Sequence, residues 1–233
     1  MASQDLHAAR LALDRIKRQD PPTYKDLVAD DIYRATGEEL SGRRVLDLGA
    51  NVGMFALLAL SKGARSVVAV EPDPCNFARL VENVRGFPVV PLNVAALGPS
   101  QRTGVIRGFS SSCSIVASGA GVVVEGRALR ALLSLFPEDD GDLVLKMDVE
   151  GSEFDVLLNA AGEDVRRFST IYVEIHGQEP PSPLDTGKLQ AYIRYLGYEE
   201  RWHRPLFWYQ WDGQGRMVSC KPIPLDTFKY ARK

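Results

Sequence analysis

The residues most suited to chemistry lie in LKMDVEGSE, residues 145–153, where an apolar run gives way to charge. The charged members are Lys146, Asp148, Glu150 and Glu153. Charged groups at the exit of a buried strand cost free energy unless they are paired or used. Successive side chains of an extended chain alternate, so Lys146, Asp148 and Glu150 are expected on one side. Such a group can orient a substrate or move a proton; a charged helix cap is the plainer interpretation.

His176 follows a second apolar run, IYVEI at residues 171–175. Of the three histidines in the chain, it alone comes directly after a predicted core strand. Because an imidazole can accept a proton near neutral pH, His176 is a candidate general base. The alternative is a structural histidine bonded to Glu174 or to a backbone carbonyl.

A glycine turn occupies VLDLGANVG, between a predicted strand and the next predicted helix. Gly49 and Gly53 allow a tight turn and a close approach of a ligand to the backbone. Asp47 precedes the turn, and no G-x-G-x-x-G or Gly-Lys-Ser/Thr pattern is present, so a cationic ligand suits this turn better than a pyrophosphate. A plain strand–helix turn is the alternative.

The next two predicted strands end in further polar residues. Glu71, in VEPD, lies about 20 residues beyond the glycine turn, where a carboxylate can accept both hydroxyls of a ribose. Asn93 follows the third strand, and its amide can donate and accept as adenine recognition requires. An Asx turn at Asn93 is the alternative.

The elements that must position these residues alternate between short β-type runs and amphipathic segments. Core strands are predicted at residues 44–48, 66–70, 88–92, 143–147 and 170–175. Helices are predicted at residues 6–17, 52–62, 74–85, 128–136, 153–161 and 186–196. This order predicts an α/β fold of the Rossmann-like kind, a mostly parallel sheet with helices on both faces and an antiparallel C-terminal end. Ligands of such sheets bind beyond the carboxyl ends of the strands.

Composition narrows the class of protein. The 233 residues are 45% hydrophobic and 25% charged, which is typical of a globular chain. The formal net charge of −2 argues against a protein built around phosphate-backbone binding. Three separated cysteines without a CxxC motif make a thiolate zinc site or a disulfide framework unexpected. No apolar run approaches membrane-spanning length and no signal-peptide core is visible, so we expect a protein of the reducing cytoplasm.

We expect one main domain, residues 23–233, preceded by a helical appendage at residues 1–22. The appendage places Leu6, Ala9, Leu13 and Ile16 on one face, which suits core packing, a lid or a homo-oligomer contact. The pair Asp20-Pro21 is expected to stop this helix. A small β insertion is predicted at about 101–127, and aromatic C-terminal strands at about 198–223.

Taken together, the motifs resemble those of the FkbM family of S-adenosylmethionine-dependent methyltransferases, within the Rossmann-like class I methyltransferases. The resemblance covers about residues 31–177. It rests on VLDLGANVGMF, VVAVEPDPCNFARLVENV, DLVLKMDVEGSEFDVL and IYVEIHG in this order. The last sixty or so residues match no family pattern.

The resemblance implies S-adenosylmethionine as cofactor and assigns residues to its parts. The amino-acid end is assigned to Asp47, Gly49, Asn51 and Gly53. Glu71, followed by Pro72, is assigned to the ribose, Asn93 and Ala95 to the adenine, and Asp148 to the methionine end.

For the reaction, the resemblance points to methylation of a hydroxyl on a small-molecule, saccharide or natural-product acceptor. His176 is the candidate base, Glu150 the second choice, and Asp148 and Lys146 orienting groups. The serine-rich loop with Ser111 and Ser112 is expected to close over the cleft and contact the acceptor, a hairpin turn being the alternative.

Three other functions stay open. In a metal-assisted O-methyltransferase, Asp148, Glu150 and a further oxygen ligand would bind magnesium, although we expect no metal requirement. In an RNA-directed enzyme, aromatics of residues 202–211 would stack on bases, although a small acceptor is favoured over nucleic acid, and no membrane partner is expected. The last alternative is a non-catalytic cofactor-binding scaffold.

Overall fold

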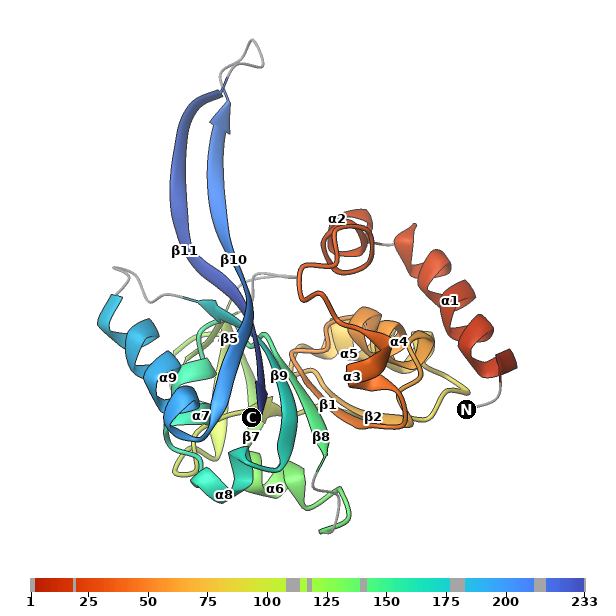
Figure 1. Ribbon diagram of the computed structural model, residues 1–233, viewed down its shortest axis with the longest axis horizontal. Coiled ribbons are helices and arrows are strands. Elements are labelled where there is room, and N and C mark those ends of the chain that lie inside the picture. Colours follow the sequence, from red (N-terminus) through yellow and green to blue (C-terminus); the bar gives the residue numbers. More distant parts are fainter. Residues whose placement is uncertain are drawn as a thin grey trace.

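The computed structural model describes residues 3–18, 20–107, 114–116, 119–138, 142–176, 183–211 and 217–232. Its main sheet has the strand order β10-β11-β9-β8-β1-β2-β3 (Figure 1). Its strands are β1 (Arg44–Leu48), β2 (Ser66–Val70), β3 (Val89–Leu92), β8 (Leu143–Met147), β9 (Phe168–His176), β10 (Tyr198–Trp211) and β11 (Met217–Arg232). From β9 to β3 neighbouring strands are parallel, whereas β11 runs antiparallel to both β9 and β10. The predicted Rossmann-like class, with its antiparallel C-terminal end, is confirmed.

Helices cover both faces of this sheet, because the strands are apolar on both sides. In β1, Val45 packs into a cluster with α4 and α1, while Leu46 and Leu48 face the cluster of α6, α7 and α9. These helices are α1 (Ser3–Lys17), α4 (Met54–Ser61), α5 (Pro74–Asn83), α6 (Leu129–Leu133), α7 (Glu153–Leu158), α8 (Gly162–Val165) and α9 (Pro183–Tyr195). Runs that are apolar throughout are typical of parallel strands buried between two helical layers.

The helix α1 packs on α4 through the face predicted from the sequence. Ala9, Leu13 and Ile16 are buried in the same cluster as α4, whereas Leu11 on the other side is 57% exposed. The apolar face is therefore used within the chain. A homo-oligomer contact through this helix, and the division into appendage and domain, stay predictions.

The segment after α1 departs from the simple stop expected at Asp20-Pro21. Asp20 also begins a new helix: its side chain accepts a hydrogen bond from the Thr23 N–H, and proline occupies the first position of α2 (Pro21–Tyr24). A π-helical turn, η1 (Lys25–Ala29), continues α2, and α3 (Gly37–Leu40) follows. The proline pair thus ends one helix and opens the next.

The predicted β insertion forms a separate small sheet in the order β4-β7-β5-β6. Its strands are β4 (Ala95–Ala96), β5 (Thr103–Arg107), β6 (Ser114–Val116) and β7 (Val122–Arg127). Ser111 and Ser112, which we expected to contact an acceptor, lie outside the described residues, so their role stays a prediction.

The strands β10 and β11 continue past the end of β9 as a two-stranded ribbon, drawn in blue in Figure 1. The last pair between β11 and β9 is Leu225 with His176, so the ribbon rises on the side of the sheet where the parallel strands end. In the part of the chain that is described, no helix is long and apolar enough to cross a membrane.

Candidate functional site

A cavity of about 290 Å³ lies where the parallel strands end. Its wall takes residues from the ends of β1, β2 and β8 and the loops that follow them, and Glu174 from β9 itself. The other sides come from α2, η1 and Ile32, and from Asn76 of α5 and Ala96 of β4. The acidic residues among those that line it are Asp26, Glu71, Asp148, Glu150 and Glu174. None of the described lining residues is lysine, arginine or histidine. The cavity therefore suits a ligand that carries positive charge.

A hydrogen bond joins the glycine turn to Glu71, the carboxylate predicted to bind a ribose. Gly49 has φ +76° and Asn51 φ +50°, and the Asn51 N–H donates to Oε2 of Glu71 at 2.7 Å. The other oxygen of Glu71 accepts from the Asp73 N–H at 2.9 Å. Each carboxylate oxygen keeps a lone pair for a ligand hydroxyl. Burial raises the pKa of Glu71 to about 7, although these backbone bonds lower it.

Beneath the cavity lies a buried charge cluster around Lys146. Its ammonium donates to the Gly49 carbonyl at 2.7 Å and pairs with Asp47 at 3.4 Å and Asp148 at 3.5 Å. Burial disfavours this ammonium, but the charges of Asp148 and Asp47 raise the pKa of Lys146 overall. Lys146 and Asp47 are fully enclosed and do not line the cavity. We therefore infer that Lys146 orients the glycine turn and Asp148.

Glu150 and His176, the two candidate bases, lie close together in the structure. Nε2 of His176 lies 3.3 Å from Glu150 and 3.8 Å from Asp148, and Nδ1 lies 2.8 Å from Glu153. Burial disfavours the imidazolium, but the hydrogen bond and charge of Glu153, with the other two carboxylates, raise the pKa of His176 to about 10. Burial raises the pKa of Glu150 to about 7. Before a cationic ligand binds, His176 is thus expected to be protonated near neutral pH, and Glu150 is the readier proton acceptor.

Glu174 is a further acid of the wall, and it is bonded to the N-terminal segment. The Tyr33 hydroxyl donates to Oε2 of Glu174 at 3.2 Å. Burial and the charge of Asp148 raise the pKa of Glu174 to about 8. Tyr33 is buried against the rings of Phe55 and Tyr172. These contacts place residues 31–36, called the strap below, beside the cavity.

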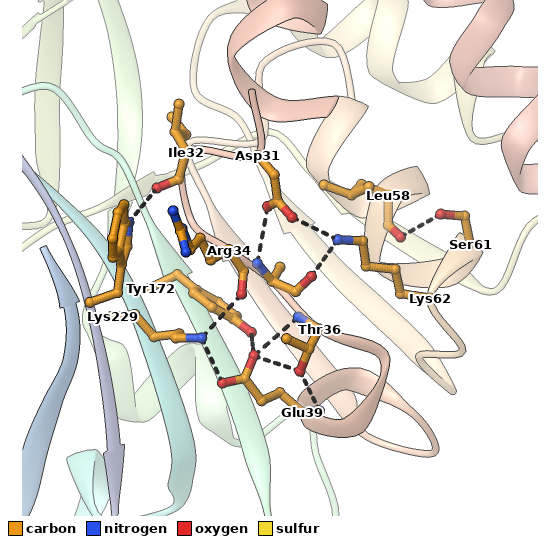
Figure 2. A network of polar contacts seen from close by, with 12 residues as sticks. Asp31, Ile32, Arg34, Thr36, Glu39, Leu58, Ser61, Lys62, Tyr172 and Lys229 are labelled. Carbon is orange, nitrogen blue, oxygen red and sulfur yellow. Dashed lines mark hydrogen bonds and ion pairs between the residues drawn. The ribbon is translucent and has the colours of Figure 1, made fainter. Parts of the chain in front are cut away.

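Side chains from distant elements hold the backbone of the strap. Lys62 donates to the carbonyl of Ala35 and pairs with Asp31 at 3.2 Å (Figure 2). Lys229, from β11, donates to the Arg34 carbonyl at 3.1 Å (Figure 2). The Trp202 indole, from β10, donates to the Ile32 carbonyl at 3.1 Å. Lys62, directly after α4, and the side chains of Trp202 and Lys229 in the two C-terminal strands thus fix the carbonyl groups of the strap. Ile32 of this strap lines the cavity.

The strap is also tied to the sheet through Glu39. Figure 2 shows Lys229, Tyr172 and Thr36 converging on this carboxylate. The Tyr172 hydroxyl lies 2.8 Å from Glu39 and the Lys229 ammonium 3.0 Å. Burial opposes the charge of Glu39, yet the hydrogen bonds from Tyr172 and Lys229 lower its pKa. This network connects α3, β9 and β11 behind the cavity.

Other residues predicted for the site lie near it in different ways. Pro72 lines the cavity, whereas Ala95 is fully buried and the neighbouring Ala96 lines it instead. The Asn93 amide donates to the carbonyls of Glu71 and Pro72 at 2.9 and 3.0 Å, so it braces that loop. Gly53 begins α4 at φ +89° and packs on α5. Contacts of Asn93 and Ala95 with adenine stay predictions.

Several cavity residues were not found from the sequence. Those from the N-terminal segment are Pro22, Thr23, Asp26, Leu27 and Ile32, and those from the core are Val70, Asn76, Ala96, Val149 and Glu174. The Asp20-Pro21 pair, a helix-start signal as well as a stop, could have revealed the additional helix. No local signal shows that this helix covers the cavity.

Within the described residues, one group of side chains has the spacing for a metal ion: Asp148, Glu174 and His176 offer ligand atoms within 4.8 Å of one another. Glu174 takes the place of the Glu150 we expected in such a set. Carboxylate and imidazole ligands accept several divalent ions.

The strand order, the glycine turn after β1 and the acid after β2 define a class I S-adenosylmethionine-dependent methyltransferase, and S-adenosylmethionine is its cofactor. The acidic cavity fits the positive charges of that cofactor. The family model described as "Methyltransferase FkbM domain" matches residues 47–200, and the chain belongs to this family.

Among solved structures, similar chains include precorrin-6y C5,15-methyltransferase from Geobacter metallireducens GS-15, with 12% identity and a TM-score of 0.48 over 88% of this chain and 86% of that one. TehB from Haemophilus influenzae has 13% identity and a TM-score of 0.49 over 95% and 67%. Aeropyrum pernix fibrillarin, with natively bound S-adenosylmethionine, has 14% identity and a TM-score of 0.45 over 82% and 67%. No curated relative matches the sequence.

Proposed function

We propose that this enzyme methylates a hydroxyl of a small acceptor that is neutral or cationic, such as a saccharide or another natural product. The observation that carries the proposal is the charge of the cavity wall: five of its described residues are acidic and none is basic. A polyanionic acceptor would be repelled there, since like charges in a partly buried site interact strongly. This argues against the RNA-directed alternative.

The cofactor supplies an electrophilic methyl group on a sulfonium. Asp148 and the glycine turn are proposed to hold its amino-acid end, and Glu71 its ribose. Transfer to a hydroxyl also requires that the hydroxyl proton be accepted. Glu150 lines the cavity and Nε2 of His176 lies 3.3 Å from its carboxylate, so the two are proposed to handle this proton as a pair, with Glu150 the first acceptor. Asp148 and Lys146 are proposed to hold the Glu150–His176 pair and the glycine turn in position.

The experiment that tests this function is an acceptor screen. Purified protein with S-adenosylmethionine is offered sugars, polyketides, lipids, peptides and RNA, and products are read by mass spectrometry. We expect a product heavier by one CH₂ group from an uncharged hydroxylated acceptor. Methylation of RNA alone would refute the proposal. Turnover of no acceptor, with normal cofactor binding, would favour the scaffold alternative.

Glu71→Ala is expected to weaken cofactor binding about tenfold to a hundredfold, because two charge-assisted hydrogen bonds at a buried site are replaced by water. Titration calorimetry with the demethylated cofactor measures the dissociation constant. An unchanged constant would mean that the ribose is held elsewhere. Glu82→Gln, an exposed change on α5, is the control.

The raised pKa of Glu71 predicts that cofactor affinity depends on pH. With a pKa of about 7, Glu71 is increasingly protonated as the pH falls below 7, and the protonated form cannot accept two ribose hydroxyls. Affinity should therefore fall by up to about tenfold per pH unit below 7 and level off above it. Glu71→Gln should remove this component; a wild-type profile in that variant would contradict it.

A metal-assisted reaction is the second candidate, favoured by the spacing of Asp148, Glu174 and His176. A bound divalent ion would acidify the acceptor hydroxyl. Undiminished activity in excess chelator would exclude this candidate.

We also propose a reducing, cytoplasmic location, consistent with the exposed free thiol of Cys75.

A further inference from the structure

Glu153 is a fully buried carboxylate, at the start of α7, that has not so far been given a role in the reaction. Oε1 accepts a hydrogen bond from the Val149 N–H at 3.2 Å, and the Gly151 N–H is shared between Oε2 at 3.1 Å and Oε1 at 3.3 Å. Oε1 also lies 2.8 Å from Nδ1 of His176. Because a carboxylate only accepts, Nδ1 is the donor in this bond.

The two N–H groups belong to the turn that carries Glu150. Glu150 has φ +54° and Gly151 φ +103°, a backbone shape that a side chain at residue 150 disfavours. Glu153 fixes both ends of this turn. One buried carboxylate thus connects the loop after β8, which aims Glu150, with the end of β9, which carries His176.

We propose that Glu153 is a positioning residue for methyl transfer, which holds the His176 ring with Nε2 toward Glu150 and the cavity and holds Glu150 within reach of that nitrogen. The inference rests on the proposed role of the Glu150–His176 pair. Glu153 does not line the cavity, so it acts through these two residues and not on the acceptor itself.

The hydrogen bonds explain why a carboxylate is required at this place. A glutamine has one oxygen and one NH₂ group. With its oxygen toward His176 and Val149, its NH₂ would face the Gly151 N–H; with the amide reversed, its NH₂ would face the Val149 N–H and Nδ1–H. Either orientation sets two donors against each other and weakens the hold on the turn, which keeps only the longer contact of Gly151 with Oε1, or on the ring.

The first test is a double-mutant cycle on single-turnover rates. Glu153→Gln should slow methyl transfer about 100-fold or more, with cofactor affinity unchanged. In a His176→Ala background the same substitution should cost less than about threefold, because the ring it positions is gone. An equal loss in both backgrounds, or no loss in the wild-type background, would overturn the inference. Glu163→Gln, an exposed glutamate in the first turn of α8, is the matched control.

The second test needs no acceptor. In protein with ¹⁵N-labelled histidine, the Nδ1 proton of His176 is expected far downfield and protected from exchange, identified by its loss in His176→Ala. It should disappear in Glu153→Gln, while Glu163→Gln keeps it. A wild type without this signal, or a variant that retains it, would show that Glu153 does not hold the ring. If the wild type methylates no acceptor, the proposed function fails, and this measurement still decides the role of Glu153.

Discussion

Replacing His176 with alanine is expected to lower the single-turnover rate of methyl transfer by about 100- to 10,000-fold, the usual contribution of a positioned acid–base group. Nε2 of His176 lies 3.3 Å from Glu150, so removal of the imidazole also removes the charge that keeps this carboxylate ionised. Cofactor affinity should stay within about twofold, because the ring does not line the cavity. Rapid-quench kinetics and calorimetry measure the two quantities separately.

The companion variant is Glu150→Gln. If the pair works as a unit, either single change should cause most of the loss, and the double variant should be little slower than the slower single one. A wild-type rate in His176→Ala would show that His176 takes no part in the proton transfer. A slow Glu150→Gln beside it would assign the proton to the carboxylate alone.

Replacing Gly49 with alanine is expected to destabilise the fold by about 2–5 kcal/mol, from the left-handed backbone and from overpacking. At φ +76°, an added Cβ would lie 1.7 Å from the carbonyl oxygen of Asp148. The turn cannot move away easily: the Gly49 N–H donates to the Val70 carbonyl at 3.0 Å, and the Asp148 N–H to the Leu48 carbonyl at 3.0 Å. Urea unfolding gives the change in free energy.

Gly42 provides a matched control for this substitution. It has φ +74°, but an added Cβ would meet nothing within 4 Å. Gly42→Ala should therefore show only the backbone cost of about 1–2 kcal/mol. Equal losses in the two variants would mean that the approach of the Asp148 carbonyl does not constrain Gly49. Because this carbonyl adjoins the cavity, Gly49→Ala is also expected to weaken cofactor binding.

The core strands could be predicted closely because their signals are local. The bounds of β1, β2 and β8 agree with the runs predicted at residues 44–48, 66–70 and 143–147. Short, largely apolar segments separated by amphipathic ones predict a parallel sheet with helices on both faces. The start of α5 could also be predicted from a local signal, because Asp73 caps the helix: its side chain accepts hydrogen bonds from the N–H groups of Cys75 and Asn76.

The grouping of Gly49, Glu71, Asp148 and Glu150 at one cavity also followed from the sequence. Gly49, Glu71 and Asp148 come directly after parallel strands and Glu150 follows two residues later, and the carboxyl ends of parallel strands meet at one edge of a sheet. Residue type and position along the chain were sufficient for this inference.

The tertiary structure alone decided what closes the cavity and what charge its groups carry. Tyr33 and Glu174 are 141 residues apart, and Trp202 is 170 residues from the Ile32 carbonyl that it binds. No periodicity links such distant positions, because they meet only when the C-terminal strands add to the sheet. The raised pKa of His176 has the same origin. Burial lowers this pKa, and the carboxylates of the β8–α7 loop and of α7 raise it by more. Both effects depend on distances through space, which the order of residues along the chain does not give.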